Sequence, residues 1–175
     1  MNYATIKNCD IANGVGVRVS LFVSGCTHRC KNCFNKEAWD FSYGKEFTKE
    51  VQDEILKMLE PSYIKGLSLL GGEPFEPSNV EGLLPFMRQV VSLKDKNVWA
   101  YSGYTLEQLL ARKGKKGEQT RELLSYIDVL VDGPFIEEKR SLMLKFRGSS
   151  NQRLIDLKQT LASGKITLCD IVDRQ

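Results

Sequence analysis

Short apolar segments rich in β-branched residues alternate along this chain with segments of helical periodicity. The strand-like segments are residues 15–23, 67–70, 97–101 and 128–131. The helical segments are residues 48–60, 79–93, 105–112 and 118–126. This alternation predicts an α/β fold with a mostly parallel sheet, because parallel neighbours need a crossover that is usually a helix. Such sheets bind ligands at the carboxyl ends of their strands.

Two parts of this pattern are less regular. Pro85 lies inside the second helical segment and should kink that helix or delay its start. Beyond residue 148, Leu154, Leu157 and Leu161 suit a helix, whereas residues 166–172 suit a strand. The sequence leaves the structure of this tail open.

Size and composition favour a single domain that spans residues 1–175, because a chain of this length can bury a sizeable core. No apolar run reaches the roughly 20 residues that a membrane span needs. The N-terminus has no apolar signal core, so we expect a cytoplasmic protein. The net charge of +3 is too small to indicate nucleic-acid binding, and we expect neither nucleic acid nor a membrane as a partner.

Residues 112–117 (RKGKKG) form the one basic cluster of the sequence. Its glycines and its lack of apolar residues predict an exposed loop. A docking patch for an acidic partner is the alternative interpretation of the same residues.

Three cysteines follow the first strand-like segment in the spacing C-x3-C-x2-C: Cys26, Cys30 and Cys33. In a cytosolic chain, such thiols indicate metal binding or catalysis before disulfides. A cubane iron–sulfur cluster has four irons and normally takes four thiolates, so three thiolates leave one iron free for a substrate. The triplet therefore favours a catalytic [4Fe–4S] site. Cys9 and Cys169 stand apart and are expected to be small buried residues.

A zinc site is the alternative for the triplet. His28, the only histidine, could act as a fourth ligand. Four ligands packed between Cys26 and Cys33 leave little room for a tetrahedron, and the usual two pairs of zinc ligands are absent. The iron–sulfur interpretation is therefore preferred.

A second motif, Gly71-Gly72-Glu73-Pro74, follows the second strand-like segment. Alone, paired glycines after a strand often form only a turn. They also leave the backbone unshielded, so that a ligand can approach it closely, and Glu73 adds a negative charge suited to an ammonium group. Because the strand follows a cysteine loop, we interpret the motif as part of a binding site.

Together, these motifs resemble those of the radical S-adenosylmethionine superfamily. Other strings narrow the resemblance to the branch that activates glycyl-radical enzymes, and within it to the activating proteins of anaerobic ribonucleoside-triphosphate reductases. These strings are Asn13-Gly14-x-Gly16-x-Arg18, Cys33-Phe34-Asn35, Trp39-Asp40-Phe41, Tyr101-Ser102-Gly103-Tyr104, Asp132-Gly133-Pro134-Phe135 and Arg147-Gly148-Ser149-Ser150-Asn151-Gln152. Asn32 departs from the superfamily pattern, which often has an aromatic residue before the third cysteine.

The resemblance implies an incomplete (βα) barrel in which Cys26, Cys30 and Cys33 hold a [4Fe–4S] cluster. It implies that the free iron chelates the amino and carboxylate groups of S-adenosylmethionine. Asn32, Cys33 and Phe34 would then wrap the adenine side of that ligand.

The resemblance also implies roles for residues at the later strand ends. Gly71, Gly72 and Glu73 would line up with the methionyl ammonium of S-adenosylmethionine. Ser102 and Asp132 are further candidates for contacts to the ribose, the carboxylate or a bound cation. No residue beyond the cluster and its ligands is given a catalytic role.

The implied activity is reductive cleavage of S-adenosylmethionine, followed by removal of a hydrogen from a glycine of a separate chain. The implied partners are the large chain of the anaerobic ribonucleoside-triphosphate reductase and an electron donor such as a flavodoxin. Two alternatives stay open. One is an activase of another glycyl-radical enzyme, such as pyruvate formate-lyase, and the other is a non-catalytic metal-binding adaptor of the reductase.

Overall fold

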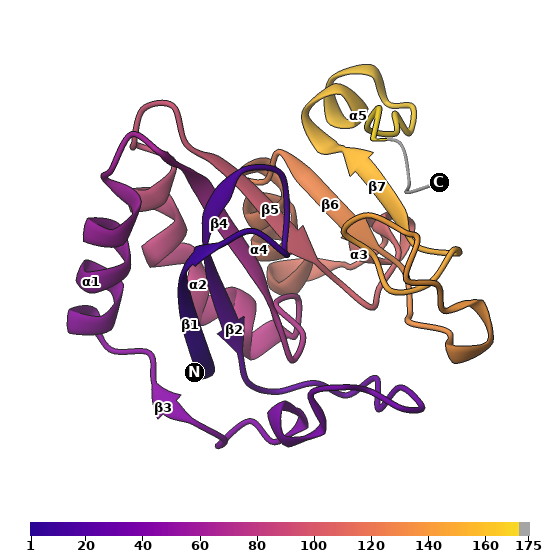
Figure 1. Ribbon diagram of the computed structural model, residues 1–175, viewed down its shortest axis with the longest axis horizontal. Helices are drawn as coiled ribbons and strands as arrows, with labels where there is room; N and C mark the ends of the chain where they lie inside the picture. The colour runs from indigo at the N-terminus through magenta and orange to yellow at the C-terminus, as the bar shows by residue number, and fades with distance from the viewer. Residues whose placement is uncertain (172–175) are drawn as a thin grey trace.

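Residues 1–171, which the computed structural model describes, contain a seven-stranded mixed sheet of order β3-β1-β2-β4-β5-β6-β7 (Figure 1). The four central strands run parallel to one another: β2 (Val17–Val23), β4 (Ile64–Gly71), β5 (Asn97–Tyr101) and β6 (Val129–Asp132). All four lie where the sequence predicted strands. The α/β prediction is therefore confirmed, with a parallel centre.

The strands towards the two edges are antiparallel to their neighbours: β1 (Asn2–Asp10), β3 (Lys45–Glu46) and β7 (Arg153–Asp156). The sequence predicted neither β1 nor β3, and a mostly parallel sheet is correct only for the centre. The side chains of β1 are exposed or half-buried along its whole length. A strand without a buried face carries no alternation of apolar residues that would reveal it.

The helices pack against the sheet through the main apolar core: α1 (Lys49–Leu59), α2 (Pro77–Val90), α3 (Leu106–Leu110) and α4 (Gly114–Ser125). Thr48 caps α1, because its hydroxyl accepts from the backbone N–H of Val51 at 3.5 Å. Helix α2 starts at Pro77 and continues past Pro85. Pro85 therefore does not delay the start of the helix. A short 3-10 helix, η1 (Lys36–Trp39), follows the cysteine loop, and a second, η2 (Glu137–Lys139), follows β6.

The prediction of an exposed loop at residues 112–117 is correct for the exposure of residues 113–116, but the loop itself is wrong from residue 114 on, because α4 begins at Gly114. Gly117 is needed for close packing rather than for a turn: a Cβ there would lie 2.2 Å from the carbonyl oxygen of Arg112. Arg112 itself is partly buried. Its Nη1 donates to the carbonyl oxygen of Phe75 at 2.7 Å, and its guanidinium lies 4.6 Å from the centre of the Tyr104 ring.

The tail contains both elements that the sequence left open. Leu154 lies in β7, and Leu157 and Leu161 lie in α5 (Leu157–Ser163). In the region predicted as a strand, Leu168 forms an isolated antiparallel bridge with Ile155, and residue 172 lies outside the described residues.

A buried arginine on β2 is hydrogen-bonded to side chains on β4 and β5. Arg18 is fully buried, and its guanidinium donates to the Ser68 hydroxyl and to the Asn97 side chain, each at 2.7 Å. It also lies 5.5 Å from the centre of the Trp99 ring. Gly14 packs so closely that a Cβ would come within 2.8 Å of the Arg18 side chain, which explains one glycine of the Asn-Gly-x-Gly-x-Arg string. Burial lowers the Arg18 pKa to about 10, so the side chain stays charged.

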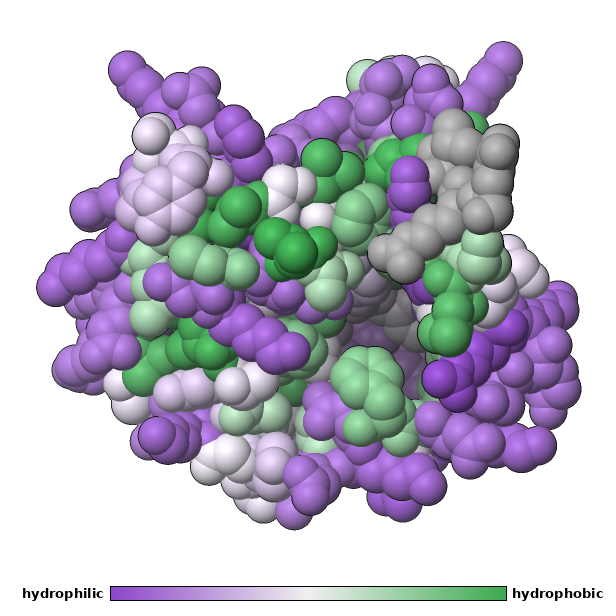
Figure 2. Space-filling model, viewed as in Figure 1, coloured by the Kyte–Doolittle hydropathy of each residue, from purple (hydrophilic) through white to green (hydrophobic). Residues whose placement is uncertain are grey.

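The face of the molecule shown in Figure 1 is hollowed, and apolar side chains gather around the hollow (Figure 2). In Figure 1 the loop that follows β2 runs along the lower part of the molecule, and the connection that follows β6 lies at the right. Within residues 1–171, none of the helices has the length and apolar character that crossing a membrane requires.

Candidate functional site

A cavity of about 550 Å³ opens at the carboxyl ends of the parallel strands. The loops that follow β2, β4, β5 and β6 contribute Cys26, Gly72, Ser102 and Gly133 to its lining. Loops from one edge of the sheet therefore meet at one place, as the order of strands and helices predicted. The size is that of an ordinary small-molecule site.

All three cysteines of the triplet line this cavity. Cys26 is buried, whereas Cys30 and Cys33 are half-buried. Among the residues that the structure describes, no group of three His, Cys, Asp or Glu side chains lies close enough to hold a metal ion. The thiols thus share a wall of the cavity without being drawn around one point.

Two left-handed residues shape the cysteine loop, Arg29 with a φ of 50° and Asn32 with a φ of 55°. Asparagine adopts this conformation readily, whereas bulky side chains rarely do. Asn32 therefore suits this turn better than an aromatic residue would. The turn at Asn32 is closed by the backbone N–H of Cys33, which donates to the carbonyl oxygen of Cys30 at 3.2 Å.

The surroundings of the thiols fit an iron–sulfur cluster. Burial raises the pKa of Cys26 to about 11, although the backbone N–H groups of His28 and Arg29 favour its thiolate. Burial also raises the pKa of Cys30. Bound iron offsets such a penalty, because a coordinating thiol is deprotonated by the metal charge. Backbone N–H groups directed at cysteine sulfur are a feature that tunes iron–sulfur clusters.

The two glycines of the Gly-Gly-Glu-Pro motif are required by the protein backbone itself. A Cβ on Gly71 would lie 2.6 Å from the backbone N of Val23, and a Cβ on Gly72 would lie 2.6 Å from the carbonyl oxygen of Gly25. Gly71 also has a φ of 111°. These glycines let β4 approach the end of β2, directly before Cys26, so their role is not only to leave space for a ligand.

The carboxylate of Glu73 is 99% buried and accepts four hydrogen bonds. One oxygen accepts from the backbone N–H of Phe75 and from the Ser102 hydroxyl, each at 2.9 Å. The other accepts from the backbone N–H of Gly103 at 2.7 Å and from His28 Nε2 at 2.9 Å. About four acceptor sites are all that a carboxylate offers. Glu73 therefore joins the loops that follow β2, β4 and β5.

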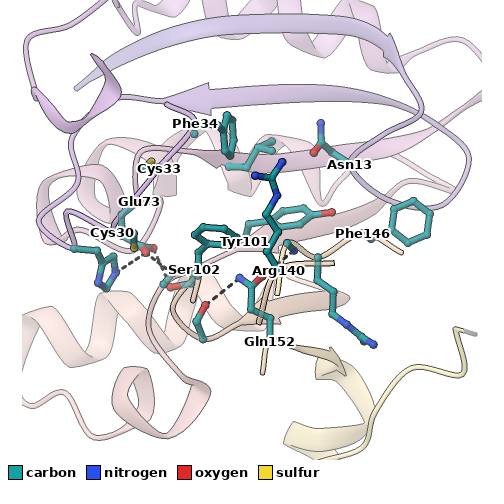
Figure 3. A pocket seen from close by; sticks show the side chains of 18 of the residues that line it. Asn13, Cys30, Cys33, Phe34, Glu73, Tyr101, Ser102, Arg140, Phe146 and Gln152 are labelled. Carbon is teal, nitrogen blue, oxygen red and sulfur yellow. Dashed lines mark hydrogen bonds and ion pairs between the residues drawn. The ribbon is translucent and has the colours of Figure 1, made fainter. Parts of the chain in front are cut away.

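The opposite wall of the cavity comes from the connection between β6 and β7 and from the segment after β1. Figure 3 shows Glu73, Cys30 and Cys33 at one side, and Asn13 and Phe146 at the other. The phenolic oxygen of Tyr101 is buried and has no hydrogen-bond partner among residues 1–171. Burial raises its pKa. The cavity thus extends well beyond the thiols.

Comparison with known proteins agrees with this geometry. The 4Fe-4S single cluster domain family matches residues 12–155. The anaerobic ribonucleoside-triphosphate reductase-activating protein of Haemophilus influenzae is 45% identical over 87% of this chain and 96% of its own length. Proteins of the same name from Escherichia coli K12 and Enterobacteria phage T4 are 39% and 38% identical, and the match covers 96% and 93% of their lengths. The chain belongs to the anaerobic ribonucleoside-triphosphate reductase-activating proteins.

Membership of this activating-protein family confirms the resemblance found in the sequence, including the [4Fe–4S] domain. S-adenosylmethionine is the second cofactor that the family implies. The residues expected to contact it all line the cavity: Asn32, Cys33, Phe34, Gly71, Gly72 and Glu73. Their individual contacts to the ligand stay predictions. Phe34 is 87% exposed, which puts its ring at the mouth of the cavity rather than at its base.

The two further candidates at later strand ends differ in position. Ser102 lines the cavity, whereas Asp132 does not appear in its lining. The Asp132 carboxylate accepts from Arg153 Nε at 2.9 Å and from the backbone N–H of Leu106 at 2.7 Å. The buried Asp132 is therefore occupied by an ion pair with the half-buried Arg153, which ties β6 to β7, and by a hydrogen bond to α3.

Sequence reasoning missed the contacts that hold the cysteine loop against the protein. It considered His28 only as a metal ligand, and it did not single out Glu76, whose carboxylate accepts from the backbone N–H of Thr27 at 2.9 Å. The His28 ring also packs 4.3 Å, centre to centre, from the Tyr104 ring. The one available signal was the position of a lone histidine inside a cysteine motif.

Proposed function

We propose that this protein activates an anaerobic ribonucleoside-triphosphate reductase by generating a glycyl radical on that separate chain. The observation that carries the proposal is that Cys26, Cys30, Cys33 and the Gly71-Gly72-Glu73 strand end line one cavity in a chain of this family. A [4Fe–4S] cluster, when bound, supplies the electron that cleaves S-adenosylmethionine. The protein contributes binding, orientation and the exclusion of water.

We assign the cluster to Cys26, Cys30 and Cys33. Cys26 is buried and follows shortly after the end of β2, so it would sit deepest, and the half-buried Cys30 and Cys33 would complete the set. Three thiolates leave one coordination position for the amino and carboxylate groups of S-adenosylmethionine. The family and the single cysteine triplet support this assignment over zinc.

We assign the two ends of S-adenosylmethionine to different loops. Asn32, Cys33 and Phe34 serve the adenine side, and the end of β4 serves the methionyl side. Because all four hydrogen bonds of Glu73 are made within the protein, its contribution to the methionyl ammonium is the attraction of a buried negative charge. The carboxylate attracts the ammonium group while keeping its four hydrogen bonds within the protein.

The remaining parts of the proposal concern the setting of the reaction. The chain forms a single domain, an incomplete (βα) barrel whose open side admits the glycine-bearing segment of the reductase. A flavodoxin-like electron donor reduces the cluster. The protein works in the cytoplasm, where cysteine thiols are kept reduced.

Electron paramagnetic resonance of the reductase tests the proposed function. The reductase is incubated anaerobically with the cluster-loaded protein, a reductant and S-adenosylmethionine. We expect a glycyl-radical signal with the wild-type protein and none with Cys30→Ala. No signal on the reductase from a fully loaded wild-type protein would overturn the proposal. A signal on pyruvate formate-lyase alone would support the alternative activase, and a colourless zinc protein that cleaves no S-adenosylmethionine would support the adaptor.

A further inference from the structure

His28 lies between two of the cysteines, yet its ring faces the protein. Its side chain is 18% exposed, and its Nε2 lies 2.9 Å from Glu73 Oε2. An ionised carboxylate only accepts, so Nε2 carries the proton of this hydrogen bond. One face of the ring packs on Tyr104. Another side packs on Gly103, where an added Cβ would lie 2.6 Å from the ring.

Glu73 links His28 to the residues at the end of β5. The oxygen that accepts from His28 also accepts from the backbone N–H of Gly103, directly after β5. The other oxygen is held by Ser102 and Phe75. Ser102 and Gly103 directly follow β5, and Phe75 lies between β4 and α2, so the carboxylate cannot shift without breaking buried hydrogen bonds. His28 is thereby attached, through Glu73, to the residues that follow β4 and β5.

Further contacts fix the residues on both sides of Cys26. Glu76 accepts from the backbone N–H and the hydroxyl of Thr27, at 2.9 Å and 2.5 Å. The Asn79 side chain donates to the carbonyl oxygens of Ser24 and Glu73, each at 2.9 Å. The segment from Glu73 to Asn79 thus holds residues 24–28 at several points. His28 is the last of these residues before the left-handed Arg29.

We propose that His28 is a positioning residue that, through Glu73, fixes the first half of the cysteine loop before any cluster is present. It bonds to a carboxylate rather than to a metal, so it is not a fourth ligand. Its contribution is to reduce the number of conformations from which Cys26 and Cys30 must be brought together during cluster assembly. The part that concerns cluster assembly rests on the proposed function, whereas the ordering of the loop does not.

Two substitutions separate the hydrogen bond from the packing of the ring. His28→Leu keeps an apolar side chain against Tyr104 but cannot donate to Glu73. His28→Gln places an amide N–H near the position of Nε2 and should restore the hydrogen bond. Lys36→Ala is the matched control, because Lys36 is exposed and close to the loop. Far-ultraviolet circular dichroism establishes that each variant is folded.

The first measurement is amide hydrogen exchange of the cluster-free protein, followed in the peptide that covers residues 24–34. We expect exchange to be roughly tenfold faster in His28→Leu, as for a lost hydrogen bond to a charged group. Exchange in His28→Gln and Lys36→Ala should stay within about twofold of the wild type. The second measurement is the rate at which a chelator removes iron from the reconstituted protein, for which we expect the same order of variants.

Wild-type exchange in His28→Leu would overturn the proposal. Equal effects of His28→Leu and His28→Gln would overturn it too, because ring packing alone would then explain the result. Stoichiometric zinc in the anaerobically purified wild-type protein, lost in both variants, would show that His28 is a metal ligand. A wild-type protein that cannot be loaded with iron would refute the proposed function, while the exchange measurement on the cluster-free protein would still decide the role of His28.

Discussion

The cysteine loop consists of two halves that are built differently. The inner half, residues 24–28, contains the buried Cys26 and is hydrogen-bonded to the segment from Glu73 to Asn79. Its backbone also donates to two carbonyl oxygens of η1. The Gly25 N–H donates to the Ala38 carbonyl at 2.8 Å, and the Cys26 N–H donates to the Trp39 carbonyl at 3.2 Å. In the outer half, residues 29–34, the backbone–backbone hydrogen bond that the structure shows is internal, from Cys33 to Cys30.

This difference separates two tasks that one short motif must perform. The inner half places one thiol at a fixed point relative to the sheet. The outer half carries two half-buried thiols on turns made by left-handed residues, with Phe34 exposed at the end. We infer that the inner half sets where the cluster forms, and that the outer half sets how the cluster and its ligand are enclosed. The following predictions test that separation.

Replacing any cysteine of the triplet should have the largest effect. Cys26→Ala, Cys30→Ala and Cys33→Ala should each abolish cluster binding, because a cubane held by three thiolates cannot lose another ligand. Cys9 is exposed and Cys169 is half-buried, so the expectation that both are buried is wrong, but neither lines the cavity. Cys9→Ala and Cys169→Ala should therefore bind iron and sulfide as the wild type does. Iron and sulfide analysis after anaerobic reconstitution measures this. A nearly complete cluster in Cys30→Ala would contradict the ligand assignment, and loss of the cluster in Cys169→Ala would mean that a ligand has been missed.

Glu73→Gln should damage the inner half without touching a cysteine. Two of the four donors around Glu73 would face an amide that also donates, which leaves buried N–H groups unpaired. We expect the free energy of unfolding of the cluster-free protein to fall by about 2–3 kcal/mol. Urea denaturation measures this value. The control is Glu138→Gln, which removes the exposed ion pair of Lys31 in the outer half and should change stability by less than about 1 kcal/mol. Equal effects of the two substitutions would contradict the comparison.

From the sequence alone, Glu73→Gln would be expected to act mildly and only on ligand binding, because the motif indicates a free charge near an ammonium group. The structure changes that expectation. His28 and Glu73 are 45 residues apart in the chain, and no local pattern indicates that they are in contact. Gly72 is a similar case. The sequence indicates that it leaves space for a ligand, whereas in the structure it packs against the Gly25 carbonyl. A substitution such as Gly72→Val would therefore disturb the cysteine loop as well as the ligand site.

The parts of the fold that the sequence did predict are those with a local signature. The central strands are buried, so their apolar runs are continuous, and Gly71, Ser102 and Gly133 mark the ends of three of them. The cysteine triplet identified the cavity because ligand spacing is itself local. Strand β1 and the short edge strand β3 bury little, and their pairing depends on partners elsewhere in the chain.

A substitution at Asn32 tests whether the outer half depends on its turns. Asn32→Val places a β-branched residue at a φ of 55°, which costs about 1–2 kcal/mol locally. Asn32→Gly relieves that strain and should behave like the wild type. We expect reduced iron content after reconstitution in Asn32→Val only. If both variants load iron equally well, the left-handed turn is not needed to bring Cys30 and Cys33 to the cluster.

The smallest effect on the fold should come from Phe34→Ala, which therefore separates the two halves most clearly. Phe34 is 87% exposed, so its removal should change the free energy of unfolding by less than about 0.5 kcal/mol. If its ring covers the adenine side of S-adenosylmethionine, the loss of that contact should weaken binding roughly fivefold, as expected for an aromatic pair worth about 1 kcal/mol. Anaerobic calorimetry on the cluster-loaded variant measures the affinity, and urea denaturation of the cluster-free variant measures stability. Phe34→Leu is the matched control, because it keeps an apolar side chain at the mouth of the cavity but cannot stack. Unchanged affinity in Phe34→Ala would refute the adenine contact, and a large loss of stability would show that the outer half is as firmly built into the fold as the inner half.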